Sequence, residues 1–431
     1  MQIKAEINAQ IKSCSSQQMV IEVAIPLVDS MLSGEEVIQI AVNAVGLLGT
    51  TTLLKRFDTD GTPIVLGPLR CTSKGLVEKE YETPYGKARI ERHVYQSAQG
   101  GDTFCPLDEG ARIIRSATPK LAKIVANKYS RSSVDEVKAD FGDNHGRSLS
   151  RGHIQDIANE VGTIAMAKEA SWRYAPDLTE AVSTVAIGID GAMMLMRETG
   201  YRQAMSGSIA FYDQAGQRLH TDYIAGAPEY GKARFFERMS REIAQTKAQY
   251  PEAQYIGIAD GASDNWTFLQ QHTSTQITDF YHASEYLTQA SQALFKSSQE
   301  TARIAWLEQH CHDLKHHEQA VVDQLQELAQ LRAEKSLSAA NQEKLDTVIT
   351  YFTNQGEWMD YAGYRSQHLP IGSGVTEAAC KVIIKQRLCR SGMRWKDRGA
   401  SIVLALRCLV QSQRWGQFWH KINQYGLPAT A

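Results

Sequence analysis

The spacing of apolar residues changes several times along the chain. In residues 1–60 it is helical, three and four positions apart. The positions that show it are Val37, Ile40, Ala41, Ala44 and Leu47. From about 62 to 107 apolar and polar residues alternate, which predicts strands, with a hairpin around the Pro/Gly turn at 83–86. We therefore expect an α+β N-terminal region over residues 1–115.

Residues 116–178 have the pattern of short helices. Ser133 and Glu136 have the spacing of a capping box, in which each side chain satisfies a free backbone N–H of the other. A Gly-containing break at 142–146 precedes a second helix beginning at Ser148 or Ser150, which predicts a helix-turn-helix DNA-binding domain. The residues near the start of that helix that would touch DNA are Arg147, Arg151, His153 and Gln155. The alternative is an ordinary helical hairpin with a solvated polar face.

From residue 182 the pattern predicts three strands, a helix, a fourth strand and a further helix. The four strands cover 182–190, 204–212, 217–225 and 255–260, and the helix before the fourth strand covers 229–248. This order, with an Asp at the end of the first and fourth strands, is the ribonuclease-H arrangement. The fold class is therefore α/β, with a ribonuclease-H-like core containing a mixed five-stranded sheet and helices.

Polar helical stretches follow the fourth strand and precede the last motif. We expect the first part of the core at 179–296 and an all-helical insertion at 297–357. The second part of the core, with a basic C-terminal segment, would cover 358–431.

Three carboxylates carry the candidate chemistry. Asp190 and Asp260 end predicted strands in Asp-Gly pairs, and Glu377 begins a helix. Carboxylates held close together stay ionised only if cations neutralise them, and Mg²⁺ and Mn²⁺ prefer oxygen ligands. We therefore predict two Mg²⁺ (or Mn²⁺) ions about 4 Å apart, with Asp190 bridging them. The alternative for an isolated Asp-Gly is turn chemistry.

The segment after Glu377 is basic. Residues 373–416 contain nine Lys or Arg and two acids, although the whole chain has a net charge of −2. Its candidate DNA-binding residues are Lys381, Lys385, Arg390 and Arg394. Lys381 and Lys385 follow Glu377 by four and eight residues, so on a helix they would share its face. There they could hold DNA phosphates. A solvated amphipathic helix is the alternative.

Composition points to a cytoplasmic protein with no membrane contact. The seven cysteines of the 431 residues form no C-x-x-C pair, which excludes a four-cysteine zinc site and favours reduced thiols. No signal peptide and no stretch of about 18 apolar residues are evident. His312 and His316 have a workable zinc spacing, but without a third placed ligand a polar helix face is the better interpretation.

Several motifs resemble those of DDE insertion-sequence transposases of the ISKra type, relatives of the Mutator-like group. They occupy 103–107, 189–191, 259–261, 372–381 and 387–395. The resemblance implies that Asp190, Asp260 and Glu377 are the catalytic acids. The related Mutator-like group also has a C/D-x-x-H element, matched here by Asp279 and His282, which are possible accessory residues.

The expected function is that of a bacterial, nucleoid-associated DNA transposase. It would bind double-stranded DNA at the terminal inverted repeats of its element, act as a homodimer or higher oligomer, and cleave and join target DNA with metal ions. One alternative is a ribonuclease-H-like nuclease or resolvase without strand transfer. The other is a catalytically silent, transposase-derived DNA-binding regulator.

Overall fold

The computed structural model describes residues 7–229 and 231–428. The chain divides into two compact units. The first comprises the residues up to Tyr174 together with those from Ala405 onward, and the second is Ala175–Leu404. The C-terminal residues therefore group with the N-terminal unit, whereas the sequence pattern assigned all of 358–431 to the core.

The first unit combines strands with one long helix, as expected, but it begins with two strands in 1–60, where the sequence pattern predicts helical structure only. Its elements are β1 (Ala9–Cys14), β2 (Met19–Val23), α1 (Met31–Lys55), β3 (Ile64–Leu66), β4 (Leu69–Glu82), β5 (Lys87–Ser97) and β6 (Gly100–Phe104). β1 pairs with β2, and β3 to β6 form an antiparallel sheet in sequence order. The expected hairpin joins β4 to β5, and its turn closes through the Thr83 N–H, which donates to the Gly86 carbonyl at 2.9 Å.

Helix α1 is unusually apolar. Among the described residues, it is the one helix long and apolar enough to cross a membrane by length and composition. One side of α1 packs within the first unit, where Val37, Ala41 and Leu54 are buried. Its amphipathic pattern is weak because apolar residues also occupy its exposed side.

A cluster of short helices follows. It consists of α2 (Pro106–Gly110), α3 (Pro119–Arg131), α4 (Val134–His145) and α5 (Arg151–Lys168). The predicted capping box is present: the Ser133 side chain accepts from the Glu136 N–H, and the Glu136 carboxylate accepts from the Ser133 N–H. Gly146 ends α4 with a left-handed φ of 59°, and the Ser150 hydroxyl caps α5. Arg147 therefore lies in the link between the helices and not in α5.

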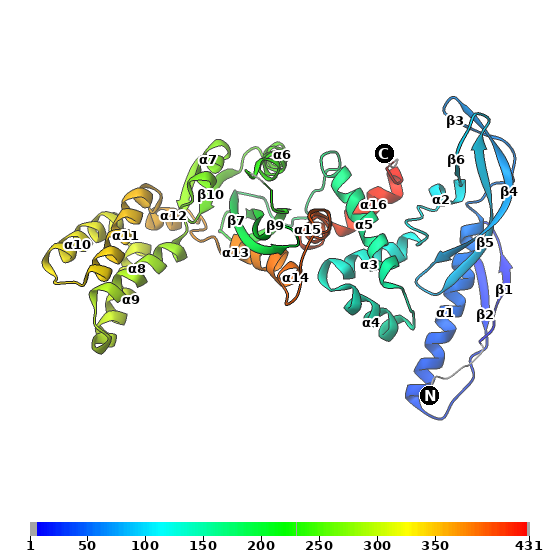
Figure 1. The fold of residues 1–431 in the computed structure, drawn as a ribbon, viewed down its shortest axis with the longest axis horizontal. Helices are drawn as coiled ribbons and strands as arrows, with labels where there is room; N and C mark the ends of the chain where they lie inside the picture. The colour runs from blue at the N-terminus through cyan, green and yellow to red at the C-terminus, as the bar shows by residue number, and fades with distance from the viewer. Residues whose placement is uncertain (1–6, 230, 429–431) are drawn as a thin grey trace. The chain divides into compact units, whose positions relative to one another are not determined.

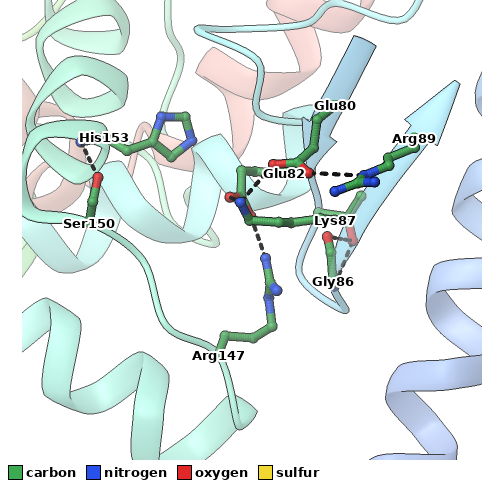
Figure 2. A network of polar contacts seen from close by, with 9 residues as sticks. Glu80, Glu82, Gly86, Lys87, Arg89, Arg147, Ser150 and His153 are labelled. Atoms are coloured by element: carbon green, nitrogen blue, oxygen red, sulfur yellow. Dashed lines mark hydrogen bonds and ion pairs between the residues drawn. The ribbon is translucent and has the colours of Figure 1, made fainter. Parts of the chain in front are cut away.

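An ion-pair network joins this link to the β4–β5 hairpin (Figure 2). Arg147 pairs with Glu82, and both side chains are largely buried, at 12% and 14% exposed. Lys87 approaches the other Glu82 oxygen at 3.6 Å and Glu80 at 2.6 Å. The imidazole of His153 lies near the network, and burial lowers its pKa. Arg147 thus connects two parts of the first unit.

The C-terminal helices complete the first unit. α15 (Asp397–Gln411) runs from the second unit into the first, and α16 (Trp415–Tyr425) follows. The Arg407 guanidinium donates to the Ser130 carbonyl at the end of α3, at 2.6 Å. Phe418 packs edge-on against Trp172. Buried contacts of this kind hold the C-terminal segment against α3 and the residues that follow α5.

Among the described residues of the second unit, five strands form one mixed sheet in the order β11-β10-β7-β8-β9. Figure 1 labels β7, β9 and β10 of this sheet. The strands are β7 (Thr184–Met196), β8 (Gly200–Tyr212), β9 (Arg218–Gly226), β10 (Gln254–Ala259) and β11 (Thr275–Thr278). β7, β8 and β9 are antiparallel neighbours, whereas β10 runs parallel to β7 and β11 parallel to β10. The expected mixed α/β sheet is confirmed.

Alternate residues of the strands face two separate apolar cores. Val185, Ile187 and Ile189 of β7 face the core that includes α6 (Ala233–Gln249) and α7 (Ser263–His272). Ala186 faces the opposite core, which includes α8 (Phe280–Leu294). Burial of both faces explains why β7 is a continuous apolar run and not an alternating one.

Helices occupy most of the chain between α8 and the last part of the sheet unit, as expected for the insertion. They are η1 (Ser297–Gln299), α9 (Glu300–His316), α10 (Ala320–Glu334), α11 (Ala339–Gln355), η2 (Gly356–Trp358) and α12 (Tyr361–Ser366). Leu314, Leu328 and Phe352 from α9, α10 and α11 join the apolar core of α8. The insertion therefore shares a core with the sheet.

We predict that Arg147→Ala destabilises the first unit. The variant leaves the Glu82 carboxylate largely buried and paired only with Lys87, which costs about 1–3 kcal/mol. Arg151→Ala is the matched control, because the Arg151–Asp135 pair is exposed and worth at most about 1 kcal/mol. Urea unfolding of the two variants measures the difference. Equal unfolding midpoints would contradict the structural role given to Arg147.

Candidate active site

Three aspartates lie in one row across the parallel strands. The register pairs Gly188 of β7 with Ile258 of β10, and Ala259 of β10 with Thr278 of β11. Continued beyond these pairs, it aligns Asp190, Asp260 and Asp279. Neighbouring strands are about 4.8 Å apart, so the three aspartates lie side by side just beyond the last paired residues of the parallel strands.

Asp190 does not end its strand, contrary to the sequence prediction. β7 continues to Met196 because β8 pairs with it along its whole length, with Asp190 opposite Ser206. On the other edge of β7, pairing with β10 stops at Gly188. The half-buried Asp190 therefore lies just beyond the residues of β7 that pair with β10, while β8 still pairs with the other edge of β7.

Glu377 comes from the first turn of α13 (Gly374–Ala379), which packs on the same face of β7 as Asp190. The close approach depends on Gly188. A Cβ on this residue would lie 1.9 Å from the Thr376 hydroxyl, which instead contacts the Ser208 hydroxyl at 2.8 Å. The absence of a side chain at 188 thus lets α13 bring Glu377 to the sheet.

Ser373 links two of the acids, a role that sequence reasoning missed. Its hydroxyl contacts both the Asp279 carboxylate and the Glu377 carboxylate, the latter at 3.3 Å. Asp279 is buried and caps α8 by accepting from the Tyr281 N–H at 2.9 Å. The only sequence signal was the position of Ser373 in the Gly-Ser-Gly motif before Glu377.

The electrostatics of these carboxylates favour a bound cation. Burial raises the pKa of Glu377, and the negative charges of Asp279 and Asp190 raise it further. Burial also raises the pKa of the Cys380 thiol, as does the charge of Asp190 beside it. An acid whose pKa is raised by other acids gains most from a positive ion nearby.

The helical insertion holds the loop after β10. The Tyr351 hydroxyl on α11 donates to the Asp260 carbonyl at 3.1 Å. Gly261 follows with a φ of +118°, and a Cβ there would lie 3.2 Å from the Tyr351 ring. Asp260 itself is exposed, and its carboxylate accepts from the Ala262 N–H at 3.2 Å. The insertion therefore positions the second acid.

His282, the other possible accessory residue, lies in the first turn of α8. Its ring packs edge-on against Tyr286 and Tyr351, which are stacked with their centroids 3.7 Å apart. Its Nδ1 lies 3.4 Å from the Glu285 carboxylate. His282 thus packs against the tyrosine that contacts the Asp260 carbonyl, whereas Asp279, its partner in the motif, is linked to Glu377 through Ser373.

The donor set fits hard divalent cations. Asp190, Asp260, Asp279 and Glu377 offer carboxylate oxygens only, the ligands that Mg²⁺ and Mn²⁺ prefer. In the part of the chain that the structure describes, the one group of three or more ligands within 4.8 Å of one another is His312, Asp313 and His317. That group is on the insertion, with both histidines about 60% exposed, as expected of a polar helix face.

The candidate phosphate-binding residues are exposed, but their helix is not regular. α13 passes into a π-helix, η3 (Cys380–Lys385), and then α14 (Gln386–Leu388). The expectation that Lys381 and Lys385 share a helix face with Glu377 stays a prediction, because the π-helix changes the angle between successive residues. The residues with exposed side chains here are Lys381, Lys385, Arg390 and Arg394.

Trp395 is a structural residue. Its indole N–H donates to the Leu388 carbonyl at 2.8 Å, and the Arg387 guanidinium lies over its ring. Its backbone N–H also pairs with the Leu195 carbonyl of β7 at 3.1 Å. These contacts fasten the basic segment to the sheet.

The helix-turn-helix candidates divide into two groups. Arg147 and His153 are largely or half buried around Glu82. Arg151 and Gln155 are exposed, with Arg151 paired to Asp135 at 3.0 Å. Of these four candidates, Arg151 and Gln155 are therefore the two that are exposed on the surface of α5.

Comparison with known proteins does not assign this chain to a family. A scan against protein-family models gives no match, and a search of curated proteins gives none.

We predict that Gly188→Ala disrupts the packing of α13. The added methyl group clashes with Thr376, and overpacking of this kind costs about 1–3 kcal/mol. Gly374→Ala is the matched control, because a Cβ there meets nothing within 4 Å. Thermal unfolding should show a lower Tm for Gly188→Ala only, partly restored by adding Thr376→Ala. A Tm unchanged by Gly188→Ala would contradict the close approach.

Proposed function

We propose that this chain is a DNA transposase with a ribonuclease-H-like catalytic core. The observation that carries the proposal is the row Asp190, Asp260 and Asp279 beside Glu377. The strand order β9-β8-β7-β10-β11, with three antiparallel strands followed by two parallel ones, supports a ribonuclease-H-like core.

Metal ions would supply the central chemistry. Two Mg²⁺ or Mn²⁺ ions held by the carboxylates would activate water or a 3′-hydroxyl and stabilise the leaving oxygen. Asp190 has both neighbours it needs for a bridging role: Asp260 on the adjacent strand and Glu377 on α13. Asp279, fixed by Ser373, would orient Glu377 and add negative charge that favours cation binding.

Exposed cations around the acids suit a polyanionic substrate. Lys381 and Lys385 follow Glu377 directly, and Arg390 and Arg394 lie in the next loop. Such side chains bind DNA phosphates irrespective of base sequence. In the first unit, Arg151 and Gln155 on α5 are the residues we assign to recognition of the terminal inverted repeats, whereas Arg147 and His153 support the fold.

The alternatives differ from this proposal in their products. A nuclease or resolvase with the same core would cleave DNA without joining a 3′ end to new DNA. A silent regulator would bind DNA with its acids dispensable. The four acids and the packing that holds them favour a catalytic protein over a regulator.

We predict metal-dependent strand transfer that depends on each acid. A duplex with the terminal repeats that flank the gene should join to a target plasmid with Mg²⁺ or Mn²⁺. Asp190→Asn, Asp260→Asn and Glu377→Gln should each lower joining at least about 100-fold, since loss of groups that only support metal ligands costs 10–100-fold.

Glu300→Gln is the control for that assay, because Glu300 is an exposed acid on the insertion. It should join DNA at the wild-type rate. Cleavage without joining would replace the proposal with a nuclease. Full joining by all three amide variants would refute the metal site.

A further inference from the structure

Four of the twelve histidines of the chain lie within eight residues at the end of α9. They are His310, His312, His316 and His317. The spacing of His312 and His316 in the sequence offers two zinc ligands on one helix face but no third. The structure adds a further donor, because the Asp313 carboxylate lies between two of these imidazoles.

Two imidazoles converge on one oxygen of Asp313. The Nδ1 atoms of His312 and His317 lie 3.4 Å and 3.2 Å from its Oδ1. In a tetrahedral zinc site, with bonds of about 2.0–2.2 Å, neighbouring ligand atoms are about 3.3–3.5 Å apart. The two distances are therefore close to those between ligands that share one ion. Each of the three residues offers a donor atom within 4.8 Å of the other two.

Hydrogen bonds alone leave this oxygen overcrowded. The Gln309 amide also donates to Oδ1 of Asp313, at 2.8 Å, and to the second oxygen at 3.0 Å. Three nitrogens thus approach Oδ1, whereas a carboxylate oxygen has about two lone pairs. A metal ion would bind one of these lone pairs and one on each imidazole, and would leave the other lone pair of Oδ1 to Gln309.

The charges at this position also favour a cation. The Gln309 amide lowers the pKa of the Asp313 carboxyl, and the neighbouring imidazoles lower it further, so the carboxylate is ionised at neutral pH. The cluster lies at the C-terminal end of the 17-residue helix α9, where the helix dipole is negative. Both the carboxylate and the helix end therefore attract a positive ion.

His316 lies beside the cluster but has another partner. Its ring stacks on that of His312 with the centroids 4.6 Å apart, and the Arg365 guanidinium contacts its ring nitrogens, the nearer at 2.7 Å. A ring nitrogen that accepts a hydrogen bond from a guanidinium has no lone pair left for a metal ion. The structure therefore favours His312 and His317 as the ligand pair, and not the pair that the sequence spacing offers.

We propose that His312, Asp313 and His317 form a binding site for one transition-metal ion, with Zn²⁺ as the ion that suits them best. Imidazole and carboxylate donors bind Zn²⁺, whereas Mg²⁺ binds through oxygen. The exposed side of the ion would keep a water molecule. The ion would join the last turn of α9 to its C-cap His317, whose N–H already donates to the Asp313 carbonyl at 2.8 Å. The inference does not depend on the chemistry proposed for the catalytic acids.

Isothermal titration calorimetry of the full-length chain with Zn²⁺ tests the proposal. Excess Mg²⁺ in the buffer competes for oxygen ligands such as the carboxylate row, and the difference between wild type and His317→Ala isolates the proposed site. His317→Ala and His312→Ala should each weaken Zn²⁺ binding at this site at least about 100-fold. Gln309→Leu, which removes the support of Asp313, should weaken it about 10–100-fold.

Two other histidine variants are the controls. His420→Ala, at an exposed position of α16, and His316→Ala should both bind Zn²⁺ as the wild type does. An unchanged Tm without metal shows that each variant is folded. Equal Zn²⁺ binding by wild type and His317→Ala, or loss of binding in His316→Ala, would overturn the proposal. Asp190→Asn should retain the site, which separates failure here from failure of the catalytic proposal.

Discussion

Parallel pairing of β7 with β10, and of β10 with β11, determines where the acids of the second unit lie. Parallel strands end at the same edge of a sheet, so a shared register turns three separate positions in the sequence into one row. The row is Asp190, Asp260 and Asp279. Because the strands are buried on both faces, a slip of one residue would move each carboxylate into an apolar core. The register is therefore strongly constrained.

Neighbouring residues position Glu377 and the loop of Asp260 relative to that row. Gly188 leaves space for α13, which brings Glu377 from a segment about 190 residues away in the sequence. The Ser373 hydroxyl contacts both the Glu377 and the Asp279 carboxylates, and the Tyr351 hydroxyl of the insertion donates a hydrogen bond to the Asp260 carbonyl. Each contact fixes the position of an acidic residue. Such an arrangement gains stability when cations bind.

Much of this was predictable from the sequence. Continuous apolar runs locate β7 and β10, and turn residues locate the β4–β5 hairpin. The extension of β7 beyond Asp190 was not predictable, because it depends on pairing with β8 and not on local pattern. The sequence pattern indicates no strand over β11, whose four residues are too few to show a period. The π-helix after α13 and the burial of Arg147 against Glu82 were likewise not predictable from the local pattern.

The central proposal is that the carboxylate row and Glu377 hold two cations. Electron paramagnetic resonance of the protein titrated with Mn²⁺ tests it most directly, because two ions about 4 Å apart are magnetically coupled. The account predicts a coupled signal that saturates at two Mn²⁺ per chain and disappears in Asp190→Asn. An uncoupled signal, or a coupled one that survives in Asp190→Asn, would contradict it.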